Sequence, residues 1–128
     1  MLFRSASHGF TTSTPWLPFG PTHANLAVDA QEADPDSLLH VTRRCLELRR
    51  SHEALRLGAM TVQVADDSLL AFERSHGDER LLCLFNLGKA ERRWNSGDDT
   101  AWDIIERVGG GEDWTLGGFA GLVARRRS

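Results

Sequence analysis

The chain has 128 residues, a hydrophobic fraction of 41% and a formal net charge of −3. That size allows one ordinary soluble domain with a modest core, together with a loose arm. The mild acidity argues against a general nucleic-acid binder, no apolar run approaches membrane-spanning length, and the first residues lack the apolar core of a signal peptide.

Residues 1–36 are predicted to form an extended arm. Three prolines stand within residues 15–21, and proline has no amide hydrogen to give and biases its predecessor away from the helix. The natural anchors of this arm are Trp16, Leu17 and Phe19. They either cover the edge of a core, which the residues alone favour, or form an aromatic platform for a sugar ring.

A helix is predicted over residues 36–53. Asp36 or Ser37 is expected at the N-cap because each offers a side-chain oxygen to the free amides of the first turn, and Gly58 is expected to stop the helix. At helical spacing the apolar residues form two neighbouring stripes, namely Leu38, Val41, Cys45, Leu48 and His52, with Leu39 and Leu46 beside them.

This apolar arc covers about half of the helix circumference, which is wider than contact with one neighbour requires. We therefore expect the helix to be in contact on two sides. Thr42 and Arg49 lie between the stripes. An arginine in that position is expected to pair with a carboxylate or with free carbonyl groups.

Short strand-like segments separated by turns follow the helix. Met60, Val62 and Val64 alternate with polar residues, which predicts a strand with one buried face. The segment 80–85 is apolar on both faces, which predicts a central strand. The remaining expected strands are 69–74, 91–95, 102–107 and 119–125, with turns at 66–67, 75–78 and 86–89. This spacing indicates a mainly β fold, an antiparallel β-sandwich, with the one long helix and the arm outside it.

No metal motif, phosphate loop or nucleophile elbow occurs in the sequence. The five histidines are scattered, and the carboxylates cluster where turns are expected, at Asp66-Asp67, Asp98-Asp99 and Glu112-Asp113. We therefore assign no catalytic residue, no metal site and no cofactor. The arginines 125–127 are interpreted as a solvated terminus. Cys45 and Cys83 lie within apolar patterns and are expected to be buried free thiols in a reducing, cytoplasmic setting.

Several stretches resemble the end of alpha-glucosidases and oligo-1,6-glucosidases of glycoside hydrolase family 13, the alpha-amylase family. The first, Gly9-Phe-Thr-Thr-Ser-Thr-Pro-Trp-Leu-Pro18, resembles a segment late in their catalytic barrel. The next resemble the last barrel helix and its exit, and then strands of the C-terminal β-sandwich: residues 31–39, 46–49, 52–55 and Gly58, followed by 69–74 and 81–87.

The resemblance implies that residues 1–58 are a remnant of the barrel end and residues 59–128 a C-terminal β-sandwich. The parent would hydrolyse alpha-glucosidic bonds with retention, using carboxylates from earlier barrel strands. A complete barrel needs roughly 200 residues or more, so these 128 residues cannot contain one. No position matches a catalytic motif, and the fragment is expected to be inactive alone.

The resemblance also gives the wide apolar arc a reason, because the last helix of these enzymes lies against the barrel. Without a barrel we expect an exposed apolar surface around Leu38, Val41 and Leu48, or self-association that buries this surface. An alpha-glucan or maltooligosaccharide would be a partner through the parent enzyme. The alternative is a free-standing carbohydrate-binding or protein-interaction module that uses Trp16, Trp94, Trp102 or Trp114.

Overall fold

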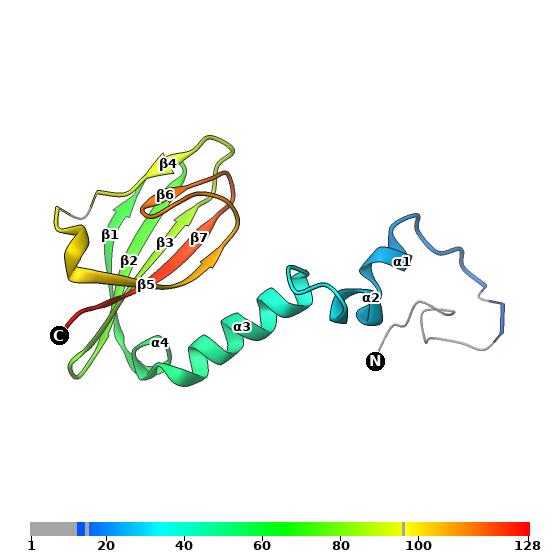
Figure 1. The fold of residues 1–128 in the computed structure, drawn as a ribbon, viewed down its shortest axis with the longest axis horizontal. Helices are drawn as coiled ribbons and strands as arrows, with labels where there is room; N and C mark the ends of the chain where they lie inside the picture. The colour runs from blue at the N-terminus through cyan, green and yellow to red at the C-terminus, as the bar shows by residue number, and fades with distance from the viewer. Residues whose placement is uncertain (1–12, 15, 96) are drawn as a thin grey trace. The chain divides into compact units, whose positions relative to one another are not determined.

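The computed structural model describes residues 13, 14, 16–95 and 97–128. The chain divides into two compact units, Met1–Leu48 and Arg49–Ser128 (Figure 1). This division falls within the long helix and not after Gly58. The assignment of 1–58 to a barrel remnant stays a prediction, and the arm residues 1–12 lie outside the described residues.

The first unit contains two short helices in the segment predicted to be extended, α1 (His23–Leu26) and α2 (Val28–Glu32). The expectation of an extended arm up to residue 36 is therefore wrong for residues 23–32. Proline restricts its own backbone and that of the residue before it, and the next proline after Pro21 is Pro35. Between them the chain is free to form helical turns from residues with adequate helix propensity.

The long helix α3 (Leu38–Ser51) begins directly after Ser37, which is one of the two residues expected at its N-cap. The Ser37 carbonyl accepts from the amide of Val41 at 3.0 Å, and its hydroxyl lies 3.5 Å from the amide of His40. Gln31 of α2 adds a second cap, because its side-chain oxygen accepts from the Leu39 amide at 3.0 Å. These bonds satisfy amides that the first helical turn leaves without intrahelical partners.

The apolar arc of α3 is not buried by the described residues. Leu38 is 73% exposed and Leu46 is 50% exposed, and no residue of α3 is classed as buried. Cys45 is exposed, so the expectation that this thiol is buried is wrong. Arg49 donates to the Leu55 carbonyl at 2.7 Å, which confirms the carbonyl interpretation of that residue.

The predicted helix 36–53 ends at Ser51, and a separate helix α4 (Glu53–Leu57) follows it. His52 between them is extended, with φ −121° and ψ 111°. Glu79, which lies far along the chain, lies 2.9 Å from the His52 ring Nδ1 and accepts from the Ala54 amide at 2.8 Å. Glu79 thus supplies the cap of α4, and a helix pattern alone gives no indication of this break.

Gly58 ends α4 as expected, but for a steric reason. Its amide donates to the Ala54 carbonyl at 3.1 Å. A Cβ at this position would stand 2.3 Å from that same carbonyl oxygen and 2.9 Å from the Ser75 oxygen. Its φ of −70° is open to any residue, so the close approach of backbone is what requires glycine here.

The second unit is an antiparallel five-stranded sheet of order β1-β2-β3-β7-β5, covered by a two-stranded sheet of β4 and β6. The strands are β1 (Ala59–Ala65), β2 (Leu69–His76), β3 (Glu79–Asn86), β4 (Arg92–Arg93), β5 (Trp102–Val108), β6 (Thr115–Leu116) and β7 (Gly121–Arg126). A 3-10 turn, η2 (Asp99–Ala101), precedes β5. Figure 1 shows β4 and β6 lying over the larger sheet. The mainly β, antiparallel sandwich fold is thereby confirmed; β6 was not predicted.

The central position of β3 is confirmed, since Leu81, Leu82, Cys83 and Leu84 are all buried. The core lies on one face of the large sheet, where Leu82 and Leu84 of β3 pack with Trp114 and with Leu116 of β6. The burial of Cys83 raises the pKa of its thiol to about 11, because charging it there would cost solvation.

Strand β1 differs from the expectation of one buried apolar face. Met60 is 59% exposed and Val62 is 50% exposed, whereas Val64 packs against the core. The pairing with β2 shifts between Val62, opposite Phe72, and Val64, opposite Ala71. This bulge places Val62 and Val64 on opposite faces of the sheet, so the alternation in the sequence does not describe one face.

Asn86 at the end of β3 joins the two sheets. Its side chain is buried, and its amide nitrogen donates to the carbonyls of Ala90 at 2.8 Å and Gly117 at 2.9 Å. Its side-chain oxygen accepts from the Gly88 amide at 3.0 Å. The same nitrogen lies 3.3 Å from the carbonyl of Leu116 in β6. One amide thus satisfies buried backbone groups from both neighbouring loops.

Replacing Asn86 with alanine is expected to lower the free energy of unfolding by about 2–4 kcal/mol, because buried backbone groups lose their partners. Urea denaturation followed by tryptophan fluorescence measures this change. The control is Gln63→Ala, an exposed amide in β1, for which we expect a change within about 0.5 kcal/mol. Equal effects of the two substitutions would contradict the assigned role of Asn86.

Replacing Glu79 with glutamine is expected to destabilise the fold at neutral pH and not in acid. Burial alone would raise the pKa of Glu79, but hydrogen bonds with His52 and the Ala54 amide outweigh it and lower the pKa below 4.5. The native carboxylate therefore stabilises the fold above its unfolded pKa, and this contribution is lost as the pH falls through the native pKa.

The Glu79→Gln difference should be about 1 kcal/mol at pH 7 and should disappear below the ordinary glutamate value of 4.5. Unfolding free energies at several pH values measure it. Glu112→Gln, an exposed residue, serves as the control. A difference that stays constant down to pH 3 would show that the Glu79 charge is not involved.

Candidate functional site

The tryptophans divide into core residues and one exposed ring. Trp102 and Trp114 are buried in the core of the second unit, and Trp94 packs against it. The indole Nε1 of Trp94 is buried without a hydrogen-bond partner among the described residues. Trp16 is 88% exposed. Of these four side chains, only Trp16 offers an open aromatic face of the kind that binds a sugar ring.

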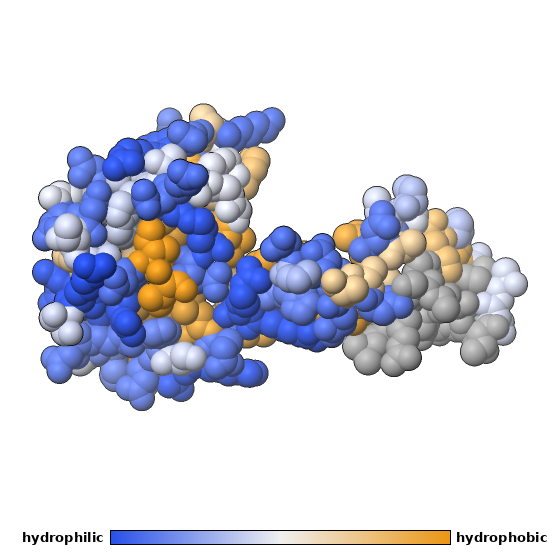
Figure 2. All heavy atoms as spheres, in the orientation of Figure 1, coloured by the Kyte–Doolittle hydropathy of each residue, from blue (hydrophilic) through white to orange (hydrophobic). Residues whose placement is uncertain are grey.

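The arm around Trp16 carries further exposed apolar side chains. Leu17 and Phe19 are exposed, and the Phe19 ring contacts the His23 ring edge-on with centroids 5.6 Å apart. Figure 2 shows hydrophobic residues at the surface of this unit. Both interpretations of the arm, a cover for the edge of a core and a platform for a sugar ring, stay predictions.

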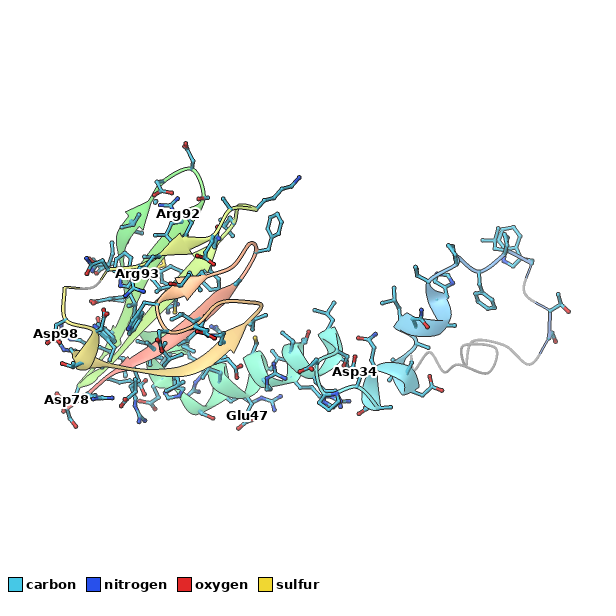
Figure 3. All side chains as sticks on the ribbon, turned by 45° about the horizontal axis from the view of Figure 1, so that its top comes forward. Asp34, Glu47, Asp78, Arg92, Arg93 and Asp98 are labelled. Carbon is cyan, nitrogen blue, oxygen red and sulfur yellow. The ribbon has the colours of Figure 1, made fainter. Side chains whose placement is uncertain are left out.

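The expected turn carboxylates are engaged in local structure. Asp66 pairs with Arg92 of β4 at 2.7 Å and accepts from the amides of Ser68 and Leu69. The hydrogen bond with Arg92, followed by those with the two amides, holds the pKa of Asp66 well below its usual range. Figure 3 shows Arg92 on the sheet unit. This carboxylate fixes the β1–β2 turn against β4.

Asp98 has a similar local role at the start of η2. Its side chain accepts from the hydroxyl of Thr100 at 2.6 Å and from the Thr100 amide at 3.1 Å. These bonds lower the pKa of the Asp98 carboxyl. Asp113, in the third cluster, has a positive φ of 48° in a tight turn. The carboxylates of Asp66 and Asp98 therefore serve turns, as acids commonly do.

A shallow hollow of about 490 Å³ lies near the chain terminus, lined by Asp78, Glu79, Arg80, Asp103 and residues 125–128. The Arg127 guanidinium donates to Asp103 at 2.7 Å, and Arg126 lies 5.9 Å from the centre of the Trp102 ring. The arginines interpreted as a solvated terminus thus line this hollow. Both acidic and basic side chains line it, so its charge favours neither an anion nor a cation.

The histidines do not form a common site in the described part of the chain. His52 lies beside Glu79, and His76 lies 3.6 Å from Glu53. The ring of His40 contacts the Glu32 carbonyl, and His8 falls outside the described residues. No group of three or more histidine, cysteine, aspartate or glutamate side chains suited to a metal ion occurs in the described ranges. None of the helices found there is long and apolar enough to cross a membrane.

Comparison with curated proteins finds alpha-glucosidases. A probable alpha-glucosidase of Rhizobium meliloti (strain 1021) is 47% identical over 79 residues, which cover 62% of this chain and 14% of that protein. An oligo-1,6-glucosidase of Parageobacillus thermoglucosidasius is 30% identical over 86 residues, or 66% of this chain and 15% of that protein. The chain thus spans about a seventh of the length of these curated relatives. No protein-family model matches it.

Solved structures of related enzymes match nearly the whole chain. An alpha-glucosyl transfer enzyme matches with a TM-score of 0.77 and 30% identity, over 99% of this chain and 25% of that one. An isomaltulose synthase of Erwinia rhapontici NX5 matches with a TM-score of 0.82 and 21% identity, over 99% of this chain and 25% of that one. The similarity of these structures extends through both compact units of the chain.

Proposed function

Because this chain is homologous to the C-terminal part of alpha-glucosidases and oligo-1,6-glucosidases of glycoside hydrolase family 13, we propose that it is the accessory part of an alpha-glucosidase-type hydrolase. Its role is to support a catalytic barrel that acts on alpha-glucosidic bonds. It has no turnover by itself, and an alpha-glucan or maltooligosaccharide binds only to the complete enzyme.

The exposed apolar side of α3 carries this proposal. Ordering each backbone residue costs roughly 1–2 kcal/mol, and burying a large apolar side chain returns roughly 1.5–3 kcal/mol. A helix that leaves Leu38 and Leu46 exposed recovers little of that cost from the described residues, and isolated helices of this length are marginal in water. A supporting surface from a larger enzyme would supply the missing burial.

The carboxylates support the absence of independent chemistry. Retaining hydrolysis of a glycosidic bond needs two carboxyl groups about 5–5.5 Å apart across the substrate. Asp66, Asp98 and Glu79 are each bound to guanidinium, backbone or histidine partners, which leaves them poorly placed for that work. The unpaired thiols of Cys45 and Cys83 are compatible with a reducing, cytoplasmic setting.

The alternative function is a free-standing carbohydrate-binding or protein-interaction module, favoured by the exposure of Trp16. Titration with maltose while following tryptophan fluorescence distinguishes the two functions. A saturable change that is lost in Trp16→Ala supports the binding module.

Self-association through the α3 surface around Leu38, Val41 and Leu48 is a further proposal, and light scattering of the purified chain measures it.

The purified chain is expected to release no nitrophenol from p-nitrophenyl alpha-glucoside above the buffer background. The physical reason is that the carboxylate pair of the reaction belongs to a barrel that residues of this chain do not form. A complete relative such as an oligo-1,6-glucosidase serves as the positive control. Sustained release by the chain alone, which disappears when Asp66 or Asp98 is replaced by asparagine, would contradict the proposed function.

A further inference from the structure

The outer edge of strand β1 is open for pairing. β1 comes first in the strand order β1-β2-β3-β7-β5 and is hydrogen-bonded to β2 on one side (Figure 1). No other strand of the described residues pairs with its outer side. The outward N–H and C=O groups of an edge strand form a template for another strand. The edge of β1 is therefore available for hydrogen bonds with a further chain.

β1 lacks most of the features that protect an edge strand. Its sequence, Ala-Met-Thr-Val-Gln-Val-Ala, contains neither a charged residue nor a proline, whereas the opposite edge strand β5 carries an aspartate, a glutamate and an arginine. Charges, prolines and bulges are the usual devices that prevent pairing between sheet edges. β1 has one of them, the bulge between Val62 and Val64, but residues 59–62 keep a regular register with β2. This regular part of the edge is unprotected.

Apolar side chains are exposed along the same part of the edge. Leu57, at the end of α4, is 64% exposed, and Met60 and Val62 are 59% and 50% exposed. Met60 and Val62 point to the same face of the sheet, because they are two residues apart in the regular part of the strand. A strand added at this edge would lie beside these two side chains and remove part of their apolar surface from water.

The regular part of β1 is complementary to itself in the antiparallel direction. A two-fold axis through Thr61 places the two copies of this threonine opposite each other, and places Met60 of each copy opposite Val62 of the other. Residues directly opposite on antiparallel strands point to the same face, and threonine pairs hydrogen-bond across strands. The pairing thus joins apolar side chains on one face and threonines on the other, and it opposes no charges. A two-fold interface requires one patch that fits itself.

We infer that β1 pairs antiparallel with β1 of a second copy of this chain, with the two-fold axis at Thr61, so that two five-stranded sheets become one continuous sheet. The inference goes beyond the proposed function and does not depend on it, because it uses only residues of β1. It also differs from self-association through α3, since Leu38, Val41 and Leu48 take no part in the strand pairing.

The test measures the mass of the full 128-residue chain by light scattering over a range of concentrations. Thr61→Lys makes two positive charges face each other across the two-fold axis. Within one chain the same substitution places its charge opposite Glu73 of β2, which favours the fold. Leu38→Lys is the matched control, because it adds the same charge at an exposed position of α3. Circular dichroism establishes that each variant folds.

We expect a concentration-dependent dimer for the unchanged chain and for Leu38→Lys, and a dimer dissociation constant at least about tenfold larger for Thr61→Lys. Thr61→Glu should weaken the dimer in the same way. Mixing the Thr61→Lys and Thr61→Glu chains should restore a dimer that contains one copy of each, because opposite charges then face each other across the axis.

Three results overturn the inference. The first is an unchanged chain that stays monomeric at every concentration measured. The second is a dimer that Leu38→Lys dissociates at least as strongly as Thr61→Lys, because the α3 surface then holds the two copies together. The third is that the folded Thr61→Lys and Thr61→Glu chains do not associate when mixed, which shows that the copies do not meet at this residue.

A cysteine variant replaces the mixing experiment if Thr61→Glu does not fold. Directly opposite residues of antiparallel strands have Cα atoms about 4.5–5.5 Å apart, a separation that a disulfide spans. Thr61→Cys is made together with Cys45→Ser, which removes the exposed native thiol. Mild oxidation should then link two copies covalently, and Cys45→Ser alone should give no link. A double variant that stays unlinked overturns the inference.

Discussion

The domain depends on the burial of β3 on both faces of the large sheet. Leu82 and Leu84 point into the core, and Leu81 and Cys83 point to the side of α4. A strand that is apolar on both faces can stay folded only if each face is covered. Each end of β3 carries a polar residue, Glu79 or Asn86, that binds one of the covering elements.

Glu79 and Asn86 each hold a different element over β3. Glu79 holds the start of α4 through the Ala54 amide and contacts His52, so the segment leading out of α3 is fixed to the sheet unit. Asn86 holds the loops around β4 and β6 by donating to Ala90 and Gly117. Because an unpaired buried polar group costs more than a hydrogen bond gains, each contact specifies one arrangement of the covering element.

The surfaces that this arrangement leaves uncovered lead to the functional proposals. The apolar side of α3 and the aromatic arm around Trp16 are incompletely buried. Monomeric proteins rarely leave large contiguous apolar areas in water. Under the proposed function, which rests on homology to part of much longer glucosidases, an enzyme body would complete this burial.

Sequence periodicity was sufficient for features that local chemistry decides. The apolar run 80–85 predicted the central strand, Ser37 was one of two expected caps, and the acidic pairs at 66–67 and 98–99 were correctly placed in turns. Trp102 and Trp114, which the sequence offered only as candidates for a binding module, are buried in the core. The resemblance of the chain to alpha-glucosidases and oligo-1,6-glucosidases was confirmed by the relatives.

The sequence by itself thus determined the antiparallel sandwich, its central strand and the kinship of the chain, since these depend on patterns within short segments. Only the tertiary structure decided where α3 ends, which face of β1 is buried and which thiol is exposed. The end of α3 depends on Glu79, which is far along the chain, and the buried face of β1 depends on a bulge between Val62 and Val64. The exposure of the Cys45 thiol depends on what packs against α3. Such contacts form between segments distant in sequence, so no local periodicity encodes them.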